Sequence, residues 1–215
     1  KFAFINPDYK LQVEKTQDLE TIPFSTDLKL IDVNPFVKIS FNNLKIQSNL
    51  IGKYNYTNIA VACTIGNYFN ISSTKIKEAI ESYLPTNYRS QIIEKVANRV
   101  ILDAYNANPS SMKAALENFN SLKDKYKTVV LGDMFELGNE SLKEHQSIVD
   151  LASNLNFTNV FLVGEHFYKT NSTLKIFKDF NSLNRFIKNN PLKQQSILIK
   201  GSRGMRLERL LDIIE

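Results

Sequence analysis

The chain has 215 residues, a length that suits one large domain or two small ones. Hydrophobic residues make up 43% and charged residues 23%, a composition typical of globular proteins. No apolar run approaches the ~18 residues that a membrane-spanning helix needs. The single cysteine, Cys63, lies in an apolar stretch that favours a buried thiol. The net charge of +5 comes without a basic block interleaved with aromatic residues, so neither a membrane span nor nucleic-acid binding is supported. With no cysteine pair to indicate an oxidising compartment, we expect a cytoplasmic protein.

The first 50 or so residues alternate short β-like runs with proline-containing turns. The clearest runs are Phe2–Ile5, Lys10–Val13, Leu28–Val33 and Phe36–Phe41. Asn42-Asn43 predicts a hairpin turn before a further run, Leu44–Ile46, so a region of antiparallel strands is expected. The chain starts inside a strand-like run without an initiator methionine, which suggests a piece of a longer protein.

The apolar period then changes to that of a helix. From Asn58 to Phe69 apolar side chains recur at positions i, i+3, i+4 and i+7. A second helix is expected from Ser73, its cap, to near Leu84. Pro85–Tyr88 is typical of a linker, so we expect two domains, residues 1–86 and 87–215.

From Arg89 onward strand-like runs alternate with helical patterns. The expected strands are Gln91–Val96, Arg99–Leu102, Thr128–Leu131, Val160–Val163 and Ser196–Ile199. The expected helices are Pro109–Leu122, Ser141–Asn154, Ser182–Lys188 and Met205–Ile214. Strands separated by helices predict right-handed βαβ units, hence an α/β domain with a doubly wound, mostly parallel, Rossmann-like sheet.

The strongest candidate site follows the strand that ends at Leu102. A carboxylate, Asp103, comes next, and Tyr105, Asn106 and Asn108 follow it. Asn108 precedes a proline, which predicts a helix N-cap followed by proline at the first helical position. In open α/β sheets ligands bind at the carboxyl ends of strands. A cluster of amides is not needed for a core, so this loop is interpreted as a site.

Two asparagines and an arginine that precede this loop each have a structural and a ligand-binding interpretation. Asn55 and Asn58 lie at a helix entrance, where asparagine either caps the helix or reads the hydrogen-bonding edge of adenine. Arg89 is either an ordinary surface arginine or a phosphate ligand, because a guanidinium pairs with two phosphate oxygens at once.

Two later stretches also have both a structural and a functional interpretation. Asp133 and Glu136 follow the strand that ends at Leu131, and His145 lies on the apolar stripe of the next helix, where an interior histidine is commoner than a base. The stretch Lys200–Arg206 joins the last strand to the last helix. It predicts either an anion site or an ordinary basic loop.

Four stretches in this order resemble the Mur ligase family. They are Leu50–Asn58, Asp103–Met112, Leu131–Gly138 with His145, and Lys200–Arg206. The resemblance covers residues 50 to 210 and is strongest to the members that add D-Ala-D-Ala. It implies an ATP-dependent carbon–nitrogen ligase of peptidoglycan precursor synthesis. In such enzymes ATP phosphorylates the carboxylate of UDP-N-acetylmuramoyl-tripeptide, and the amine of D-Ala-D-Ala attacks the acyl phosphate.

The resemblance also implies roles for single residues. Asn55 and Asn58 would contact adenine, Asp103 the ribose hydroxyls and Arg89 the phosphates of ATP. D-Ala-D-Ala would be bound by Tyr105, Asn106, Asn108, Ser202 and Arg203. Residues that match family positions and would support these from behind are Asp133, Glu136, His145 and Lys200. No catalytic residue and no metal ligand is assigned within this chain.

Departures from the family pattern limit what the chain can do alone. Tyr54 stands where the family usually has histidine, Leu102 replaces the first of two aspartates, and Tyr88 replaces a frequent glycine. No Gly-Lys-Thr/Ser phosphate loop is present, and the ligands of Mg²⁺ are expected upstream. The resemblance therefore implies that residues 1–86 are the end of a central ATP-binding domain and residues 87–215 the C-terminal domain. We expect this piece to be a monomer without ligase activity alone.

Two other functions stay open at this point. The first is a different Mur-type amino-acid ligase, similar to folylpolyglutamate or cyanophycin synthetases, against which the Asn-Ala-Asn-Pro and Lys-Gly-Ser-Arg pair argues. The second is a non-catalytic nucleotide-binding module. An intact phosphate loop in the upstream coding sequence would argue against that alternative.

Overall fold

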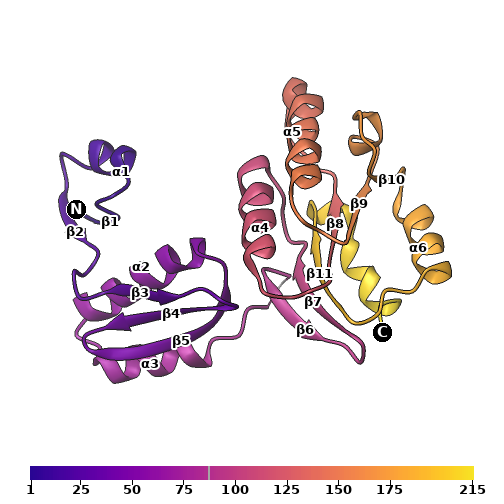
Figure 1. Cartoon of the computed structure of the whole chain (residues 1–215). Helices are drawn as coiled ribbons and strands as arrows, with labels where there is room; N and C mark the ends of the chain where they lie inside the picture. Colours follow the sequence, from indigo (N-terminus) through magenta and orange to yellow (C-terminus); the bar gives the residue numbers. More distant parts are fainter. Residues whose placement is uncertain (87) are drawn as a thin grey trace. The chain divides into compact units, whose positions relative to one another are not determined.

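A computed structural model describes residues 1–86 and 88–215 and divides the chain into two compact units, Lys1–Leu84 and Pro85–Glu215 (Figure 1). The division falls two residues before the boundary expected from the sequence. Asn87, inside the expected linker, lies outside the described residues. None of the helices in the described residues is both long and apolar enough to cross a membrane.

Unit 1 contains a three-stranded antiparallel sheet and two long helices. The strands β3 (Lys29–Asp32), β4 (Phe36–Phe41) and β5 (Leu44–Ile51) pair in that order, and α2 (Tyr54–Tyr68) and α3 (Ser73–Ser82) pack on them. The core residues include Val37, Ile39, Phe41, Ile46, Ile59, Cys63 and Ile76. Burial raises the pKa of the Cys63 thiol to about 12, which fits the inert thiol expected from the sequence.

The predicted hairpin turn is confirmed. Phe41 pairs with Leu44, and between them Asn42 and Asn43 have φ angles of 46° and 63°. A two-residue turn of this kind needs positive φ at both central positions, which asparagine tolerates better than other side chains.

The start of the chain differs from the sequence prediction. Lys10–Lys15 forms a helix, α1, and not a strand, and it connects β1 (Phe2–Ile5) to β2 (Glu20–Pro23), which pair in parallel rather than antiparallel fashion. Leu11 and Val13 suggested a strand by their alternation. Their side chains are 51% and 38% exposed, so the alternation carried no burial signal, and the helix propensity of Leu, Gln, Glu and Lys prevails.

Unit 2 is the α/β domain that the sequence predicts. Its six strands lie in the order β10-β9-β8-β11-β7-β6, and every neighbouring pair is parallel except β6 with β7. The strands are β6 (Gln91–Glu94), β7 (Asn98–Asp103), β8 (Lys127–Gly132), β9 (Asn159–Val163), β10 (Lys175–Phe177) and β11 (Gln195–Lys200). The short strand β10 was not predicted.

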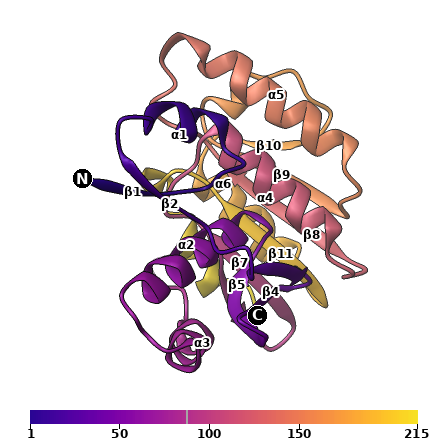
Figure 2. The same ribbon diagram turned by 90° about the vertical axis from the view of Figure 1, so that its left-hand side faces the viewer.

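Helices cover both faces of this sheet, as a doubly wound fold requires. On one face α4 (Pro109–Ser121) and α5 (Ser141–Asn154) lie side by side (Figures 1 and 2). On the other face α6 (Phe180–Asn189) and the last segment of the chain pack on the strands through Leu183, Ile187, Leu207 and Leu210.

The last segment is not the regular helix that was expected from Met205 to Ile214. It forms two short 3₁₀ turns, Arg203–Met205 and Leu207–Asp212, on either side of Arg206, whose φ is 50°. Leu207, Leu210 and Ile213 recur every three residues, a spacing that fits a 3₁₀ turn as well as an α-helix.

Gly164, which follows β9, provides a test of the packing at the end of this strand. Its φ is 129°, and a Cβ at this position would overlap the Asp133 carboxyl group. We predict that Gly164→Ala lowers the free energy of unfolding by at least about 2 kcal/mol. Gly138→Ala is the control, because Gly138 has a φ of 53° but open space around it, and about 1 kcal/mol is expected there. Urea unfolding checks both, and equal losses would contradict the proposed clash.

Candidate functional site

The parallel register of unit 2 brings the polar residues of its motifs to one edge of the sheet. Lys200, the last residue of β11, pairs with Asp103, the last residue of β7, and with Leu131 near the end of β8. The buried run Val100–Leu102 fixes β7 within the sheet. Because the carboxyl ends of parallel strands meet at the same edge, the loops after all three strands are neighbours there.

An ion pair joins two of these strand ends. The ammonium group of Lys200 donates to Oδ2 of Asp103 at 2.7 Å, and the two side chains are 2% and 16% exposed. The same ammonium donates to the Asn106 carbonyl oxygen at 3.2 Å. Lys200 therefore holds the Asp103 carboxylate and the following loop in one arrangement. A buried cation of this kind is tolerated only because it is paired.

The second carboxylate oxygen of Asp103 accepts from the backbone N–H of Ser90 at 3.0 Å. The Ser90 hydroxyl donates to the same oxygen at 3.4 Å. A carboxylate has about four acceptor positions, so Asp103 can accept one further hydroxyl donor through its exposed part. Ser90 was not singled out from the sequence, because nothing local distinguishes a backbone donor in a linker from its neighbours.

The loop after Asp103 combines structural and accessible amides. Asn108 caps α4, as predicted: its Oδ1 accepts from the Ser111 N–H at 2.9 Å, and Ser111 completes a capping box. Asn106 Oδ1 accepts from the Ala107 N–H at 2.8 Å. Both asparagines are exposed, and the side-chain N–H₂ of neither has an acceptor in the described part of the chain.

Two arginines at this edge stack on tyrosines. The guanidinium of Arg89 lies 4.0 Å from the centre of the Tyr105 ring, and that of Arg203 lies 4.7 Å from the centre of the Tyr88 ring. Arg203 also pairs with Glu208 at 3.2 Å. Arg89 has no ion-pair partner in the described part of the chain, so its charge is available to an anionic ligand.

Asp133 fastens the loop after β9 and does not face solvent. Its two carboxylate oxygens accept from the backbone N–H groups of His166 and Phe167, both at 3.0 Å. Ser202, expected to contact substrate, is 4% exposed and accepts from the Phe135 N–H at 2.9 Å. Three loops are thus tied together by side chains that the motifs supply.

His145 is fully buried on α5. Its Nε2 accepts from the Met134 N–H at 3.0 Å, and its Nδ1 lies 2.6 Å from the Ser141 carbonyl oxygen. Nδ1 therefore carries the proton of a neutral ring. Burial lowers the pKa of His145 below its usual value.

Glu136 is exposed and has a φ of 65°, and its side chain has no partner among the described residues.

A cavity of about 430 Å³ opens at the same edge. Charged residues of both signs and an aromatic ring line it, including Glu165, Lys178, Asp179, Phe180 and Arg209. Asp133, Phe135 and His166 form the side nearest the tied loops. Glu165 and His166 were missed in the sequence, although they follow a buried strand and a glycine as Asp133 does.

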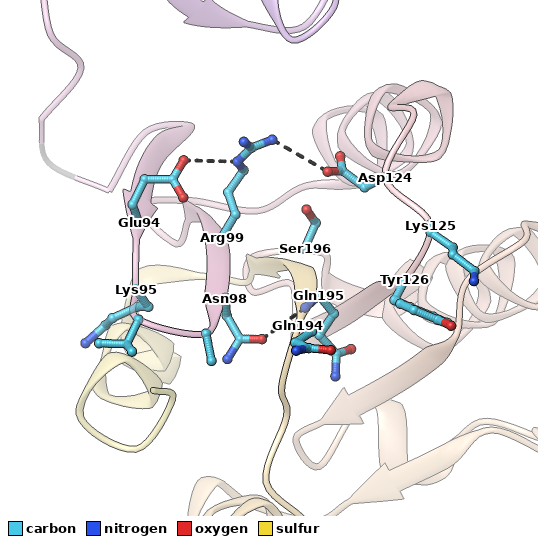
Figure 3. Close-up of a pocket in the computed structure, with 12 residues that line it drawn as sticks. Glu94, Lys95, Asn98, Arg99, Asp124, Lys125, Tyr126, Gln194, Gln195 and Ser196 are labelled. Carbon is cyan, nitrogen blue, oxygen red and sulfur yellow. Dashed lines mark hydrogen bonds and ion pairs between the residues drawn. The ribbon is translucent and has the colours of Figure 1, made fainter.

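A second hollow, of about 350 Å³, lies at the opposite edge of the sheet and is less suited to a ligand (Figure 3). Its arginine, Arg99, is already paired with Glu94 at 3.0 Å and with Asp124 at 3.5 Å. The Asn98 side chain bonds to the backbone of Leu192, Gln195 and Glu215. These polar groups satisfy each other within the protein.

In unit 1 the two predicted asparagines differ in accessibility. Asn55 is 7% exposed, donates to the Ile51 carbonyl oxygen at 2.7 Å and accepts from Asn58 at 2.9 Å. Asn58 is exposed, and its side-chain oxygen has no partner in the described residues. The helix begins at Tyr54, four residues before the predicted start, so both asparagines lie in its first turns.

Neither unit presents a metal site within its described residues: no three His, Cys, Asp or Glu side chains gather as ligands there.

A family model described as "Mur ligase, glutamate ligase domain" matches residues 88–203. The UDP-N-acetylmuramoyl-tripeptide–D-alanyl-D-alanine ligase of Rickettsia prowazekii is 33% identical over 192 residues, which is 86% of this chain and 39% of that protein. The structure of MurF from Acinetobacter baumannii has a TM-score of 0.81 at 23% identity and covers 98% of this chain and 51% of that one. The structure of MurF from Thermotoga maritima in complex with ADP has a TM-score of 0.79 at 20% identity and covers 99% of this chain and 52% of that one.

The buried ion pair can be tested by removing its cation. Lys200→Met leaves the Asp103 carboxylate without its counter-charge, and we predict a loss of about 3 kcal/mol in the free energy of unfolding. Adding Asp103→Asn should return part of that loss, since a neutral amide needs no cation. Lys193→Met is the control, because Lys193 forms only an exposed pair with Glu215 at 3.9 Å, worth less than about 0.5 kcal/mol. Similar losses for Lys200→Met and Lys193→Met in urea unfolding would contradict the prediction.

Proposed function

The chain belongs to the Mur ligase family, and from that membership we propose that it is the C-terminal part of the ligase that adds D-Ala-D-Ala to UDP-N-acetylmuramoyl-tripeptide. The single observation that carries the proposal is the 33% identity to a ligase of that name over 86% of the chain. The clustering of Asp103, Arg89 and the asparagine loop at one sheet edge supports it. The proposed product is a peptidoglycan precursor, and the proposed location is the cytoplasm.

The chain spans 39% of the length of that relative, so we assign its two parts within a longer enzyme. Residues 1–86 are proposed to end the central ATP-binding domain, and residues 87–215 to form the C-terminal domain. The division at Leu84–Pro85 and the start of the family match at residue 88 support this assignment. The chain contains no Gly-Lys-Thr/Ser phosphate loop, so we expect no ligase activity from it alone.

Roles in nucleotide binding are proposed for residues of each unit taken by itself. In unit 2, Asp103 would accept hydrogen bonds from the ribose hydroxyls, and Arg89 would pair with phosphate oxygens through its planar guanidinium. In unit 1, Asn58 has the exposed amide suited to adenine, while the buried Asn55 would act mainly by holding Asn58. Mg²⁺ does not fit the described residues, which offer no ligand cluster. Its ligands would come from the rest of the protein.

The amine substrate is proposed to bind at the carboxyl edge of the same sheet. D-Ala-D-Ala is a zwitterion, so its site needs a cation for the carboxylate and acceptors for the ammonium group. The cavity of about 430 Å³ has both, in Lys178 and Arg209 and in Glu165 and Asp179. Arg203, Asn106 and Asn108 do not line this cavity and are proposed to contact the dipeptide from neighbouring loops. Because Ser202 is buried, we propose that it supports the loops, and that Tyr105 supports Arg89.

In this proposal the chain positions reactants and contributes no nucleophile. When bound, ATP supplies the phosphoryl group that activates the tripeptide carboxylate. The protein's part is to neutralise phosphate charge with Arg89, to fix the ribose with Asp103, and to hold the dipeptide so that its amine reaches the activated carbonyl carbon. Positioning of this kind accounts for several kcal/mol of rate enhancement in ligases without covalent intermediates on the protein.

The ribose assignment is tested by ATP binding to the complete ligase. We predict that Asp103→Ala raises the ATP dissociation constant at least about tenfold, the cost of one good hydrogen-bonding partner. Asp103→Asn is the milder variant, because its amide oxygen can still accept from either Lys200 or the Ser90 N–H, and it should weaken ATP binding less. Asp124→Ala, a carboxylate at the opposite edge of the sheet, is the control and should change the constant less than about twofold. Unchanged affinity in a folded Asp103→Ala protein would remove Asp103 from the nucleotide site.

The choice of amine substrate is tested by calorimetry on the complete ligase with ATP analogue and tripeptide substrate present. We predict heat of binding with D-Ala-D-Ala and none with L-glutamate or meso-diaminopimelate at matched concentrations. Binding of L-glutamate instead would indicate a folylpolyglutamate-type enzyme. Nucleotide binding without turnover of any of the three amines would indicate the non-catalytic module.

A further inference from the structure

Three loops at the carboxyl edge of unit 2 are tied into one assembly, which we call the loop clamp (residues 133–135, 164–167 and 201–202). The Asp133 N–H donates to the Val163 carbonyl oxygen at 3.1 Å, and the Ser202 N–H donates to the Asp133 carbonyl oxygen at 3.1 Å. Asp133 and Phe135 are also walls of the cavity. The position of residues 133–135 therefore determines the shape of the proposed dipeptide site.

One backbone donor of the clamp depends on an imidazole. The Met134 N–H, in a residue that is 0% exposed, donates to Nε2 of His145, which is equally buried. No water can replace this acceptor at such burial, and an unsatisfied backbone donor costs about as much as a lost hydrogen bond. The His145 ring is held in turn by the Ser141 carbonyl oxygen at Nδ1.

We propose that neutral His145 is a positioning residue for the dipeptide site: by accepting from Met134 it holds the wall formed by Asp133 and Phe135. This inference rests on the proposed function for the identity of the ligand, but the hydrogen bond itself does not. His145 touches no ligand. Its contribution is the acceptor that α5 presents to the loop after β8.

The groups that face His145 explain why it is an acceptor and not a cation. Asp133 lies 3.7 Å from Nε2, but its oxygens already accept from two backbone N–H groups. The His166 ring stacks on His145 with centres 5.2 Å apart, and Phe167 contacts its edge. Ser141 on α5 is a further polar neighbour. Burial lowers the His145 pKa more than Asp133 raises it.

The sign of the pH dependence follows from that shift. Because the folded protein disfavours the protonated ring, the hydrogen bond is fully present above the ordinary histidine pKa of about 6.5. It is lost as the pH falls through the lower folded pKa, since an imidazolium has no acceptor. We therefore expect the KM for D-Ala-D-Ala to rise as the pH falls through the folded pKa of His145.

Two amide variants distinguish the roles of the two ring nitrogens of His145. In His145→Gln the side-chain oxygen reaches the place of Nε2 and can accept from Met134. In His145→Asn the shorter amide stays near the place of Nδ1 and leaves Met134 unpaired. In the complete ligase we expect His145→Asn to raise the KM for D-Ala-D-Ala about tenfold, with less than about a twofold change in the KM for ATP. His145→Gln should stay within about threefold of wild type and lose the acid limb of the pH profile. The exposed Lys143→Gln on the same helix is the control.

Two measurements on the 215-residue chain keep the test independent of catalysis. Nitrogen-15 NMR should show His145 neutral with the proton on Nδ1 at pH 7, and the Met134 amide should exchange faster in His145→Asn than in His145→Gln. A protonated ring, a proton on Nε2, or equal Met134 exchange in both variants would overturn the positioning role. So would an unchanged dipeptide KM in folded His145→Asn. If the wild-type ligase does not use D-Ala-D-Ala, the proposed function fails, and the NMR results still decide the role of His145.

Discussion

The insertion of β11 between β7 and β8 is the constraint on which the site of unit 2 depends. It places Lys200 beside Asp103, although 96 residues of chain lie between them. The ammonium of Lys200 is buried, so the protein gains only if the Asp103 carboxylate is present to neutralise it. Once that pair forms, the loop that begins at Asp103 is fixed through the Asn106 carbonyl oxygen, and α4 starts at a defined point behind it.

The motifs at this edge contain two kinds of polar residue, and the two kinds have different functions. Asp133, His145 and Ser202 are buried, and their hydrogen bonds join loops to one another. Arg89 and Asn106 are exposed, and their side-chain N–H groups have no hydrogen-bond acceptor among the described residues. The buried set makes the edge rigid, and the exposed set is what a ligand could meet. A rigid support beneath accessible donors is the arrangement that positioning chemistry needs.

The sequence was informative wherever local burial determined the outcome. The buried run before Asp103, the Asn108 cap and the Asn42-Asn43 turn follow from side-chain chemistry within a few residues, and all were found as expected. Pairings between distant segments could not be read in this way. Nothing local shows that Lys200 meets Asp103, or that Ser202 accepts a hydrogen bond from the Phe135 N–H. Periodicity reports which side of an element is apolar, and Leu11 and Val13 show that it fails when neither side is buried.

We propose that the ligands of this chain bind at the carboxyl edge of the six-stranded sheet. Hydrogen–deuterium exchange of the complete ligase, with and without ATP analogue and D-Ala-D-Ala, tests this proposal most directly. We expect slower exchange in residues 103–108, 133–137, 164–167 and 201–206, and no change in residues 94–99 and 124–126 at the opposite edge. Protection confined to residues 94–99 and 124–126, or no protection anywhere in unit 2, would contradict it.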